Sequence, residues 1–532
     1  MSGHIADIVV KNANVLTVDD LGTVAESFAV KNGKFVSVGT NTDTEMLSGP
    51  NTRILDLKGQ TVIPGFIDAH IHVLSSGTRH VMSADCDRRS IDEVLQALRR
   101  RSAGLGRDEW IQGFKYDDTK TEENRFLTRQ DLDTVSTDLP VFVSHRAGHV
   151  YYMNSKALEI AGLNSNTPDP PGGRFGRDPT TGDLNGVIYE RASEPVRKML
   201  PTVSIDDRTR GLKLINDMLS EAGLTSVHDA RVSSDELLSY QEGLTNGNLG
   251  PRVYMLMAHD HFASLRDSGI KTGFGNNMLK IGGIKMVSDG AIAARTAYLS
   301  EPYIGSESGD DCGIQAMSAE EIEEAVLEIH RAGFQVCIHA NGDLAIDMVL
   351  SAYEKALNFY PRNNPRHRIE HCTLVNPELL NRMRTTGTIG TPFCTYVYYH
   401  GEKMGYYGEE RLEWMFAQKS FMEYGVVATG ATDYPPGPYE PLLGIQSCVT
   451  RTDINGKLWG PSQRISSEDA LRIYTRNGAY ASFEENTKGS IEVGKLADFV
   501  ILEQDLTKVD PFTIKDIEII QTVVGGRTTY EI

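Results

Sequence analysis

The chain has 532 residues, of which 40% are hydrophobic and 23% charged, a composition typical of globular proteins. This length exceeds what one hydrophobic core usually supports, so we expect more than one folding unit. The net charge of -19 would repel nucleic-acid phosphates, and no apolar run is long enough to cross a bilayer. We therefore expect no nucleic-acid partner and no membrane insertion. The polar first residues carry no signal-peptide pattern, which predicts a cytoplasmic protein.

Short β segments dominate both ends of the chain. Neither end alone supplies enough apolar faces to close a core. The sequence therefore predicts a small β-sandwich domain built from both termini, residues 1–62 plus 486–532. Its expected strands include residues 5–11, 14–18, 27–31, 34–38, 53–56, 497–502 and 522–527.

Between the two ends, apolar strands alternate with amphipathic helices, which is the pattern of parallel β/α architecture. It favours an α/β fold, a (β/α)8 TIM-type barrel over residues 63–485, with its active site at the C-terminal strand ends. Long gaps flank the second strand, so we expect an inserted subdomain after the first barrel strand, at about residues 75–215. The predicted strands are residues 62–71, 141–144, 225–229, 281–287, 334–339, 367–371, 388–393 and 426–432.

A His-x-His pair ends the first predicted barrel strand. His70 and His72 share one face of that strand, where two imidazoles can bind one metal ion. The pair alone is weak evidence, because two histidines at a strand end are often structural. His339, His371 and Asp433 also end predicted strands, at the rim where a barrel gathers its catalytic residues. Together these positions predict a metal site.

Lys285 lies within an apolar strand, where an unpaired ammonium facing a barrel interior would be costly. Burial lowers the pKa of a lysine, and the neutral amine can react with carbon dioxide to give a carbamate that bridges two cations. We therefore predict that Lys285 is a metal ligand in its carboxylated form.

Motifs along nearly the whole chain are shared with one known superfamily. They are residues 64–72, 108–113, 148–158, 223–229, 285–296, 338–343 and 494–500. In these motifs the chain resembles the amidohydrolase superfamily, specifically amidohydrolase family 3, the branch that includes N-substituted formamide deformylase. The resemblance implies two divalent ions on the residues singled out above: one on His70, His72 and Asp433, the other on His339 and His371, with carboxylated Lys285 between them.

The expected reaction follows from that set of ligands. Zinc is the expected metal, although imidazole and carboxylate ligands also accept iron, manganese or cobalt. Metal-bound hydroxide would attack the carbonyl carbon of a small molecule, and Asp433 would carry the proton to the leaving nitrogen. We therefore expect a hydrolase of C-N bonds other than peptide bonds, acting on an amide, N-formyl or carbamate-type substrate. The sequence leaves open whether it forms a homodimer.

A further group of residues is predicted to contact substrate. The group includes a histidine in the inserted segment and a histidine at the end of the third strand, which could instead orient a ligand. It also includes an arginine that follows the predicted strand containing Lys285. The alternative role of that arginine is an ion pair with Asp289. Aromatic residues could wall a pocket for an apolar substituent, or only pack the insertion onto the barrel. These candidates are His149, His228, Arg295, Trp110, Tyr396 and Tyr398.

Two other functions compete with this interpretation. A mononuclear deaminase of a nitrogen heterocycle uses the same barrel, but it normally has a glutamate just after the fifth-strand histidine and needs no strand lysine. Here His339 is followed by Ala340-Asn341-Gly342-Asp343, and Lys285 is present. A non-catalytic ligand-binding barrel would predict a lost ligand, and the pattern lacks none.

Overall fold

The computed structural model describes residues 5–106, 109–146, 148, 150–170, 173–305 and 309–532. The chain forms two compact units. The first, here called the barrel unit, contains residues 1–73 and 215–532, and the second, the inserted unit, contains residues 74–214. No helix in the described ranges is long and apolar enough to cross a bilayer.

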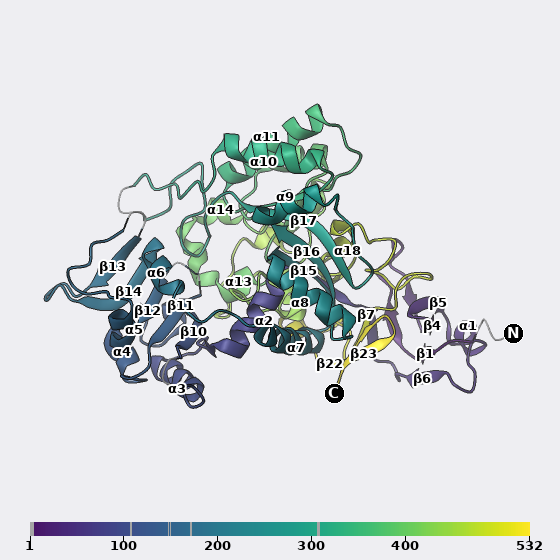
Figure 1. Cartoon of the computed structure of the whole chain (residues 1–532). Helices are drawn as coiled ribbons and strands as arrows, with labels where there is room; N and C mark the ends of the chain where they lie inside the picture. Colours follow the sequence, from purple (N-terminus) through teal and green to yellow (C-terminus); the bar gives the residue numbers. More distant parts are fainter. Residues whose placement is uncertain (1–4, 107–108, 147, 149, 171–172, 306–308) are drawn as a thin grey trace. The chain divides into compact units, whose positions relative to one another are not determined.

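Seven parallel strands form the wall of the barrel, in the order β20-β19-β18-β17-β16-β15-β8. Each strand is almost entirely buried, as expected for strands covered on both faces. The prediction of a TIM-type barrel is confirmed. The strands are β8 (Phe66–Ile71), β15 (Leu224–Val232), β16 (Arg252–Ala258), β17 (Leu279–Val287), β18 (Gln335–Ala340), β19 (Arg368–His371) and β20 (Ile389–Thr391) (Figure 1).

Residues 426–433 close the ring between β20 and β8. On one side, Ala428 and Ala431 form parallel bridges with Gly390 and Phe393. On the other side, the N–H of Ala69 donates to the carbonyl of Gly430 at 3.0 Å, and the N–H of Asp433 donates to the carbonyl of His70 at 2.8 Å. The same backbone pairing that closes the barrel therefore brings Asp433 beside the His-x-His pair.

Two predicted strand assignments are wrong. Residues 141–144 belong to β11 (Val141–His145) of the inserted unit, and β16 is the barrel strand that the sequence interpretation missed. Both segments are short apolar runs, and periodicity does not indicate which sheet such a run joins. Residues 61–64 form β7 (Thr61–Pro64) in a terminal sheet, so the first barrel strand begins only after Gly65. A Cβ at Gly65 would lie 2.1 Å from Oγ1 of Thr225, so this crossing needs glycine.

Amphipathic helices cover the barrel strands. Helices α10 and α11 pack against each other and against β18 (Figure 1). A capping box begins α10, because Oγ of Ser318 accepts from the N–H of Glu321 and the Glu321 carboxylate accepts from the N–H of Ser318. The helices are α8 (Ser234–Thr245), α9 (Phe262–Asp267), α10 (Ala319–Arg331), α11 (Asp343–Phe359), α12 (Pro377–Thr386), α13 (Tyr396–Tyr399), α14 (Glu409–Leu412), α15 (Gln418–Glu423), α16 (Pro441–Thr450), α17 (Ser467–Ile473) and α18 (Arg476–Ala481).

Strands from both chain ends form two further sheets in the barrel unit. One has the order β5-β4-β1-β6 and the other β23-β22-β21-β7-β2-β3. The ring of Phe28 lies 5.2 Å from that of Phe35 and 5.0 Å from that of Phe499, so the two ends share one hydrophobic core. The exact domain boundaries stay a prediction. The strands are β1 (Ile8–Lys11), β2 (Asn14–Leu16), β3 (Val24–Ala25), β4 (Ser27–Lys31), β5 (Lys34–Gly39), β6 (Arg53–Asp56), β21 (Phe499–Leu502), β22 (Ile519–Val524) and β23 (Arg527–Glu531), and a short helix, α1 (Asn41–Glu45), follows β5.

The inserted unit is built around a six-stranded sheet of order β13-β14-β12-β11-β10-β9. Two hydrophobic clusters, one containing Tyr116 and Tyr152 and the other Trp110 and Phe142, form its core. Its elements are α2 (Val73–Met82), β9 (Ala84–Asp85), α3 (Ile91–Ser102), β10 (Ile111–Tyr116), α4 (Arg129–Asp133), β11, β12 (Val150–Met153), α5 (Ser155–Ile160), β13 (Gly173–Arg177), β14 (Leu184–Glu190), α6 (Glu194–Arg197) and α7 (Ile205–Glu221), which leads back into the barrel unit.

A buried ion pair links the start of β16 to the terminal sheet. Nε and Nη2 of Arg252 lie 2.7 and 2.8 Å from the two carboxylate oxygens of Asp498, and both side chains are at most 5% exposed. We expect Asp498→Ala to lower the free energy of unfolding by about 3–5 kcal/mol, because it leaves a guanidinium buried without a counter-charge.

Urea titration followed by circular dichroism measures this loss. The matched control is Asp7→Ala, which breaks the exposed Lys31–Asp7 pair and should cost no more than about 1 kcal/mol. Equal losses in the two variants would contradict the role given to Asp498.

Candidate metal centre

The two histidines that end the first barrel strand meet Asp433 at the mouth of the barrel. Nε2 of His70 lies 3.5 Å from Oδ1 of Asp433, and Nε2 of His72 lies 3.3 Å from the same oxygen. One donor atom from each of the three residues lies within 4.8 Å of the others. Imidazole and carboxylate donors at this spacing fit a divalent ion such as zinc.

His339 and His371 extend this group across the neighbouring strands. The ring of His371 lies 4.0 Å from that of His339 and 5.2 Å from that of His70. The pKa of His371 is held well below its ordinary value by burial and by the nearby imidazoles. A neutral imidazole keeps a lone pair, which is the form that binds a metal.

Fixed acceptors orient three of the four imidazoles. Nδ1 of His70 faces Oε2 of Glu370 at 2.5 Å, and Nδ1 of His72 faces the carbonyl of Ala230 at 2.9 Å. Nε2 of His339 faces the carbonyl of Gly290 at 2.9 Å. Because a carbonyl or carboxylate oxygen only accepts, we assign the proton to Nδ1 of His70 and to Nδ1 of His72, whereas Nε2 of His339 also lies 3.1 Å from the amide nitrogen of Asn341. Nε2 of His70 and Nε2 of His72 then keep the lone pair that can bind a metal.

Lys285 lies on β17 beside these histidines and is only 5% exposed. Its Nζ donates to the carbonyl of Met286 at 3.1 Å. Burial lowers the pKa of Lys285 to about 8, against the opposing effect of the Glu370 and Asp433 carboxylates. About a tenth of this lysine is therefore a neutral amine at pH 7, far more than for an exposed lysine.

The backbone is strained at two of these positions. His371 has φ 68° and Asp433 has φ 54°, both in the left-handed region that non-glycine residues rarely adopt. Such conformations persist only where the surrounding structure holds them, and they concentrate at functional sites. The strain adds support for a functional role of the two strand ends.

Asp289 organises the loop after β17, and sequence reasoning gave it only a passing role. Its carboxylate accepts from the backbone N–H groups of Asn341, Gly342 and Tyr298 at 2.9–3.0 Å. Its Oδ1 also lies 3.3 Å from Nε2 of His339. A Cβ at Gly342 would lie 1.8 Å from the carbonyl oxygen of Tyr298, which explains the glycine in this motif.

The predicted substrate contacts on the barrel fall into different surroundings. Arg295 is exposed and lies over the ring of Tyr406 at 4.8 Å. Tyr396 is half-buried and stacks on Phe416 with a centroid distance of 4.8 Å. Tyr398 is also half-buried. Contact of these three side chains with substrate stays a prediction.

Of the other three predicted substrate contacts, two are buried and one lies outside the described residues. His228 is fully buried in the barrel interior, where its Nδ1 lies 2.9 Å from Nη1 of Arg368. That position favours the alternative role of orienting a ligand. Trp110 is 7% exposed and packs in the core of the inserted unit, so we do not keep it among the substrate contacts. His149 lies outside the described residues.

Sequence reasoning missed two charged residues at the centre of the barrel, Arg368 and Glu370. Both are 0% exposed, on a strand that also carries His371. The available signal was the pattern Arg-Ile-Glu-His in a segment predicted to be buried. Two charges within such a strand are rare unless they are paired.

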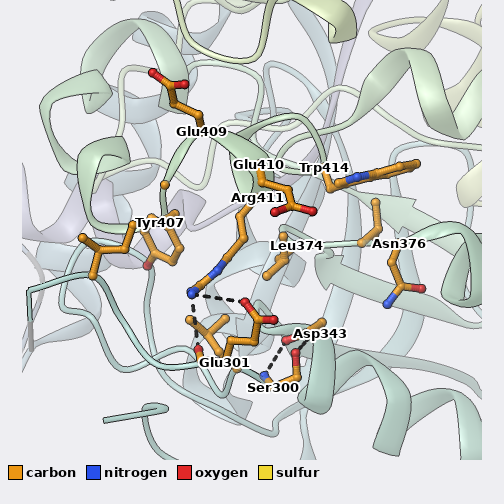
Figure 2. A pocket seen from close by; sticks show the side chains of 14 residues that line it. Ser300, Glu301, Asp343, Leu374, Asn376, Tyr407, Glu409, Glu410, Arg411 and Trp414 are labelled. Carbon is orange, nitrogen blue, oxygen red and sulfur yellow. Dashed lines mark hydrogen bonds and ion pairs between the residues drawn. The ribbon is translucent and has the colours of Figure 1, made fainter. Parts of the chain in front are cut away.

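A separate cavity of about 460 Å³ is lined by residues that follow β17, β18, β19 and β20. Figure 2 shows Arg411 turned toward Glu301, and Ser300 hydrogen-bonded to Asp343. None of the proposed metal ligands is among its described lining residues. The cavity is therefore distinct from the histidine group.

A second group of metal-type donors lies in the inserted unit. Asp117, Asp118 and His145 bring their donor atoms within 4.8 Å of one another. Nε2 of His145 already contacts Oδ1 of Asp118 at 3.2 Å, and Nε of Arg146 lies 3.6 Å from Asp117. Arg146 therefore supplies a positive charge beside Asp117, and it also pairs with Asp87 at 2.7 Å.

Comparison with known proteins agrees with this geometry. The sequence profile of the Amidohydrolase family matches residues 53–530. The chain is 30% identical over 550 residues to N-substituted formamide deformylase from Arthrobacter pascens, with 99% of this chain and 98% of that protein covered. Crystal structures of uncharacterised metal-dependent hydrolases from Pyrococcus horikoshii OT3 and Pyrococcus furiosus have TM-scores of 0.78 and 0.75, at 28% and 27% identity. They match 95% and 94% of this chain and 99% of each of those chains.

A TIM-type barrel with imidazole and carboxylate donors at its C-terminal strand ends defines a class of metal-dependent hydrolases. The profile match covers most of the chain. The chain belongs to the Amidohydrolase family and is a hydrolase that acts on carbon–nitrogen bonds. The predicted resemblance is confirmed.

Proposed function

We propose that the protein hydrolyses an amide, N-formyl or carbamate-type C–N bond of a small molecule with the help of two divalent metal ions. The observation that carries the proposal is the orientation of His70 and His72, whose Nδ1 atoms face fixed acceptors and whose Nε2 atoms both face Asp433. This arrangement is typical of metal-binding imidazoles. N-formyl compounds are the first candidates, because the Arthrobacter pascens relative is a formamide deformylase.

The proposed ligands divide between the two ions. Divalent ions, most simply zinc, supply Lewis acidity toward a carbonyl oxygen and lower the pKa of water. For Lys285, the neutral amine attacks carbon dioxide and loses a proton, so that the carbamate contributes two oxygens and no positive charge. The proposed assignment is His70, His72 and Asp433 for one ion, His339 and His371 for the other, and carboxylated Lys285 between them.

Asp433 is the proposed proton carrier. Burial tends to raise the pKa of this carboxyl, but the neighbouring imidazoles of His70 and His72 outweigh burial and hold the pKa well below its usual range. It is therefore a carboxylate that can accept a proton from the attacking water and deliver it to the leaving nitrogen. Water adds to the carbonyl carbon, the C–N bond breaks, and the products are an acid and an amine.

Metal removal tests this function. We expect chelated protein to lose amine release from N-formyl, N-acyl and carbamate substrates, and added zinc to restore it. His70→Ala should lower both the metal content and the activity, because it removes a ligand. Full activity in demonstrably metal-free protein would rule out the proposal. Ammonia release from a nitrogen heterocycle, with no amine release from amides, would favour the deaminase instead.

Selectivity should depend on the tyrosines that follow the seventh strand. We expect Tyr396→Ala and Tyr398→Ala to change kcat/KM among substrates with different N-substituents more than they change the rate on the smallest substrate. A matched control is Tyr360→Ala at the end of α11, where the side chain is 39% exposed. Equal losses on every substrate would mean that Tyr396 and Tyr398 support the fold and do not select the substrate.

A further inference from the structure

Two opposite charges lie at the centre of the barrel with no access to water. Nη2 of Arg368 donates to Oε2 of Glu370 at 2.9 Å, and Nε of Arg368 lies 2.7 Å from Oε1 as an ion-pair contact. Both side chains are 0% exposed. Removing two charges from water costs several kcal/mol per ion, so stability alone is a weak reason for this pair.

The pair belongs to a network of hydrogen bonds that extends from both of its residues. Oε2 of Glu370 accepts from Nδ1 of His70 at 2.5 Å. On the other side, Nη1 of Arg368 donates to Nδ1 of His228 at 2.9 Å, and Nη2 donates to the carbonyl of Ala69 at 2.5 Å. This network therefore connects β8, β15 and β19 through side chains inside the barrel.

One end of this network determines which ring nitrogen of His70, a proposed metal ligand, carries the proton. Because the Glu370 carboxylate only accepts, His70 carries its proton on Nδ1 and keeps the lone pair on Nε2, the nitrogen that faces Asp433. Nη2 of Arg368 donates to Oε2, the same carboxylate oxygen that accepts from His70, and this contact helps to fix the orientation of Glu370. The carbonyl of Ala69, also held by Arg368, belongs to the residue just before His70.

We propose that Glu370 and Arg368 are positioning residues that hold the His70 ring in its metal-binding orientation and thereby set the metal affinity of the site. This inference rests on the proposed function. Neither Glu370 nor Arg368 touches the reacting atoms, and both act only through His70. Carboxylates that orient a ligand histidine in this way typically change metal affinity by 10–100-fold when they are replaced.

The test compares two buried arginine–carboxylate pairs of the same protein. Glu370→Gln removes the charge beside His70, and Asp498→Asn removes the charge of the Arg252–Asp498 pair, which contacts none of the proposed ligands. Zinc affinity is measured by competition with a chromophoric chelator, and apoprotein stability by urea unfolding. We expect both variants to lose stability, but only Glu370→Gln to lose zinc affinity, by about 10–100-fold.

A double variant separates positioning from stability. Arg368→Met combined with Glu370→Gln removes both charges, so apoprotein stability should recover relative to Glu370→Gln alone. Zinc affinity should stay low, because an uncharged amide without the Arg368 contact holds His70 more weakly than the carboxylate does. Recovery of zinc affinity together with stability would overturn the proposal, as would an equal loss of affinity in Asp498→Asn.

Glu370→Asp is a second variant that keeps both charges and is expected to fold. Its carboxylate is one methylene shorter and withdraws from His70, so zinc affinity should fall and the visible absorption bands of the cobalt-substituted protein should change. Unchanged affinity and unchanged bands would contradict the inference. If the wild-type protein binds no divalent metal, the proposed function fails. If the wild-type protein binds metal and the Glu370 variants bind it equally tightly, this inference fails and the proposed function stands.

Discussion

Asp433→Asn is expected to keep the fold and to lower kcat by about 10²–10⁴-fold through loss of proton transfer alone, and further through weaker metal binding. The amide has nearly the same shape as the carboxylate, so the backbone hydrogen bond from the N–H of Asp433 to His70 should remain. An amide, however, accepts no proton from water at neutral pH and is a weaker ligand. The loss should therefore appear in kcat and kcat/KM together.

Single-turnover kinetics and metal analysis of the same preparation measure this effect. Asp453→Asn is a matched control, because Asp453 is 5% exposed and its Oδ2 accepts from Nε1 of Trp459 at 2.9 Å, outside the proposed ligand set. We expect this control to lose some stability but to keep its turnover. An Asp433→Asn enzyme that turns over at the wild-type rate would assign the proton transfer to another group.

Lys285→Ala is expected to lose both bound metal and activity. The position is buried, and the pKa of Lys285 is lowered to about 8, mainly by that burial. A neutral amine is the form that reacts with carbon dioxide, and metal ions would hold the otherwise reversible carbamate in place. Metal and carbon dioxide should therefore bind cooperatively, each raising the apparent affinity for the other.

Added propionate should partly rescue the Lys285→Ala enzyme, because a small carboxylic acid can occupy the bridging position. In the wild type, ¹³C-labelled bicarbonate should give a carbamate carbon signal that depends on added metal. Lys488→Ala is a matched control: Lys488 is equally buried but pairs with Glu484 at 2.8 Å, so its loss should leave metal content unchanged. A map with Lys285 as a plain amine in fully metallated, active enzyme would refute the bridge.

The strand ends that carry the site were predictable because each one combines two independent signals. An apolar run that stops at His339 or His371 indicates both a strand and a polar group at its end. The inserted unit was harder to separate from the barrel. Val141 to Ser144 and the first residues of β16 are similar apolar runs, and only pairing with a neighbour assigns each run to its sheet.

The sequence by itself indicated the barrel architecture and the group of candidate ligands, because these depend on local periodicity and on residue types at strand ends, and its motifs indicated the family by resemblance. Only the tertiary structure decided which ring nitrogen of His70 and of His72 faces an acceptor. It also decided that Glu370, the acceptor for His70, is paired with Arg368. Arg368 and Glu370 come from the same strand, yet they meet His228 of β15 and His70 of β8, which are 140 and 300 residues away along the chain. Contacts of that kind follow from barrel closure, which no local pattern encodes. The same closure brings Asp433 to the His-x-His pair, through backbone hydrogen bonds between residues 426–433 and β8.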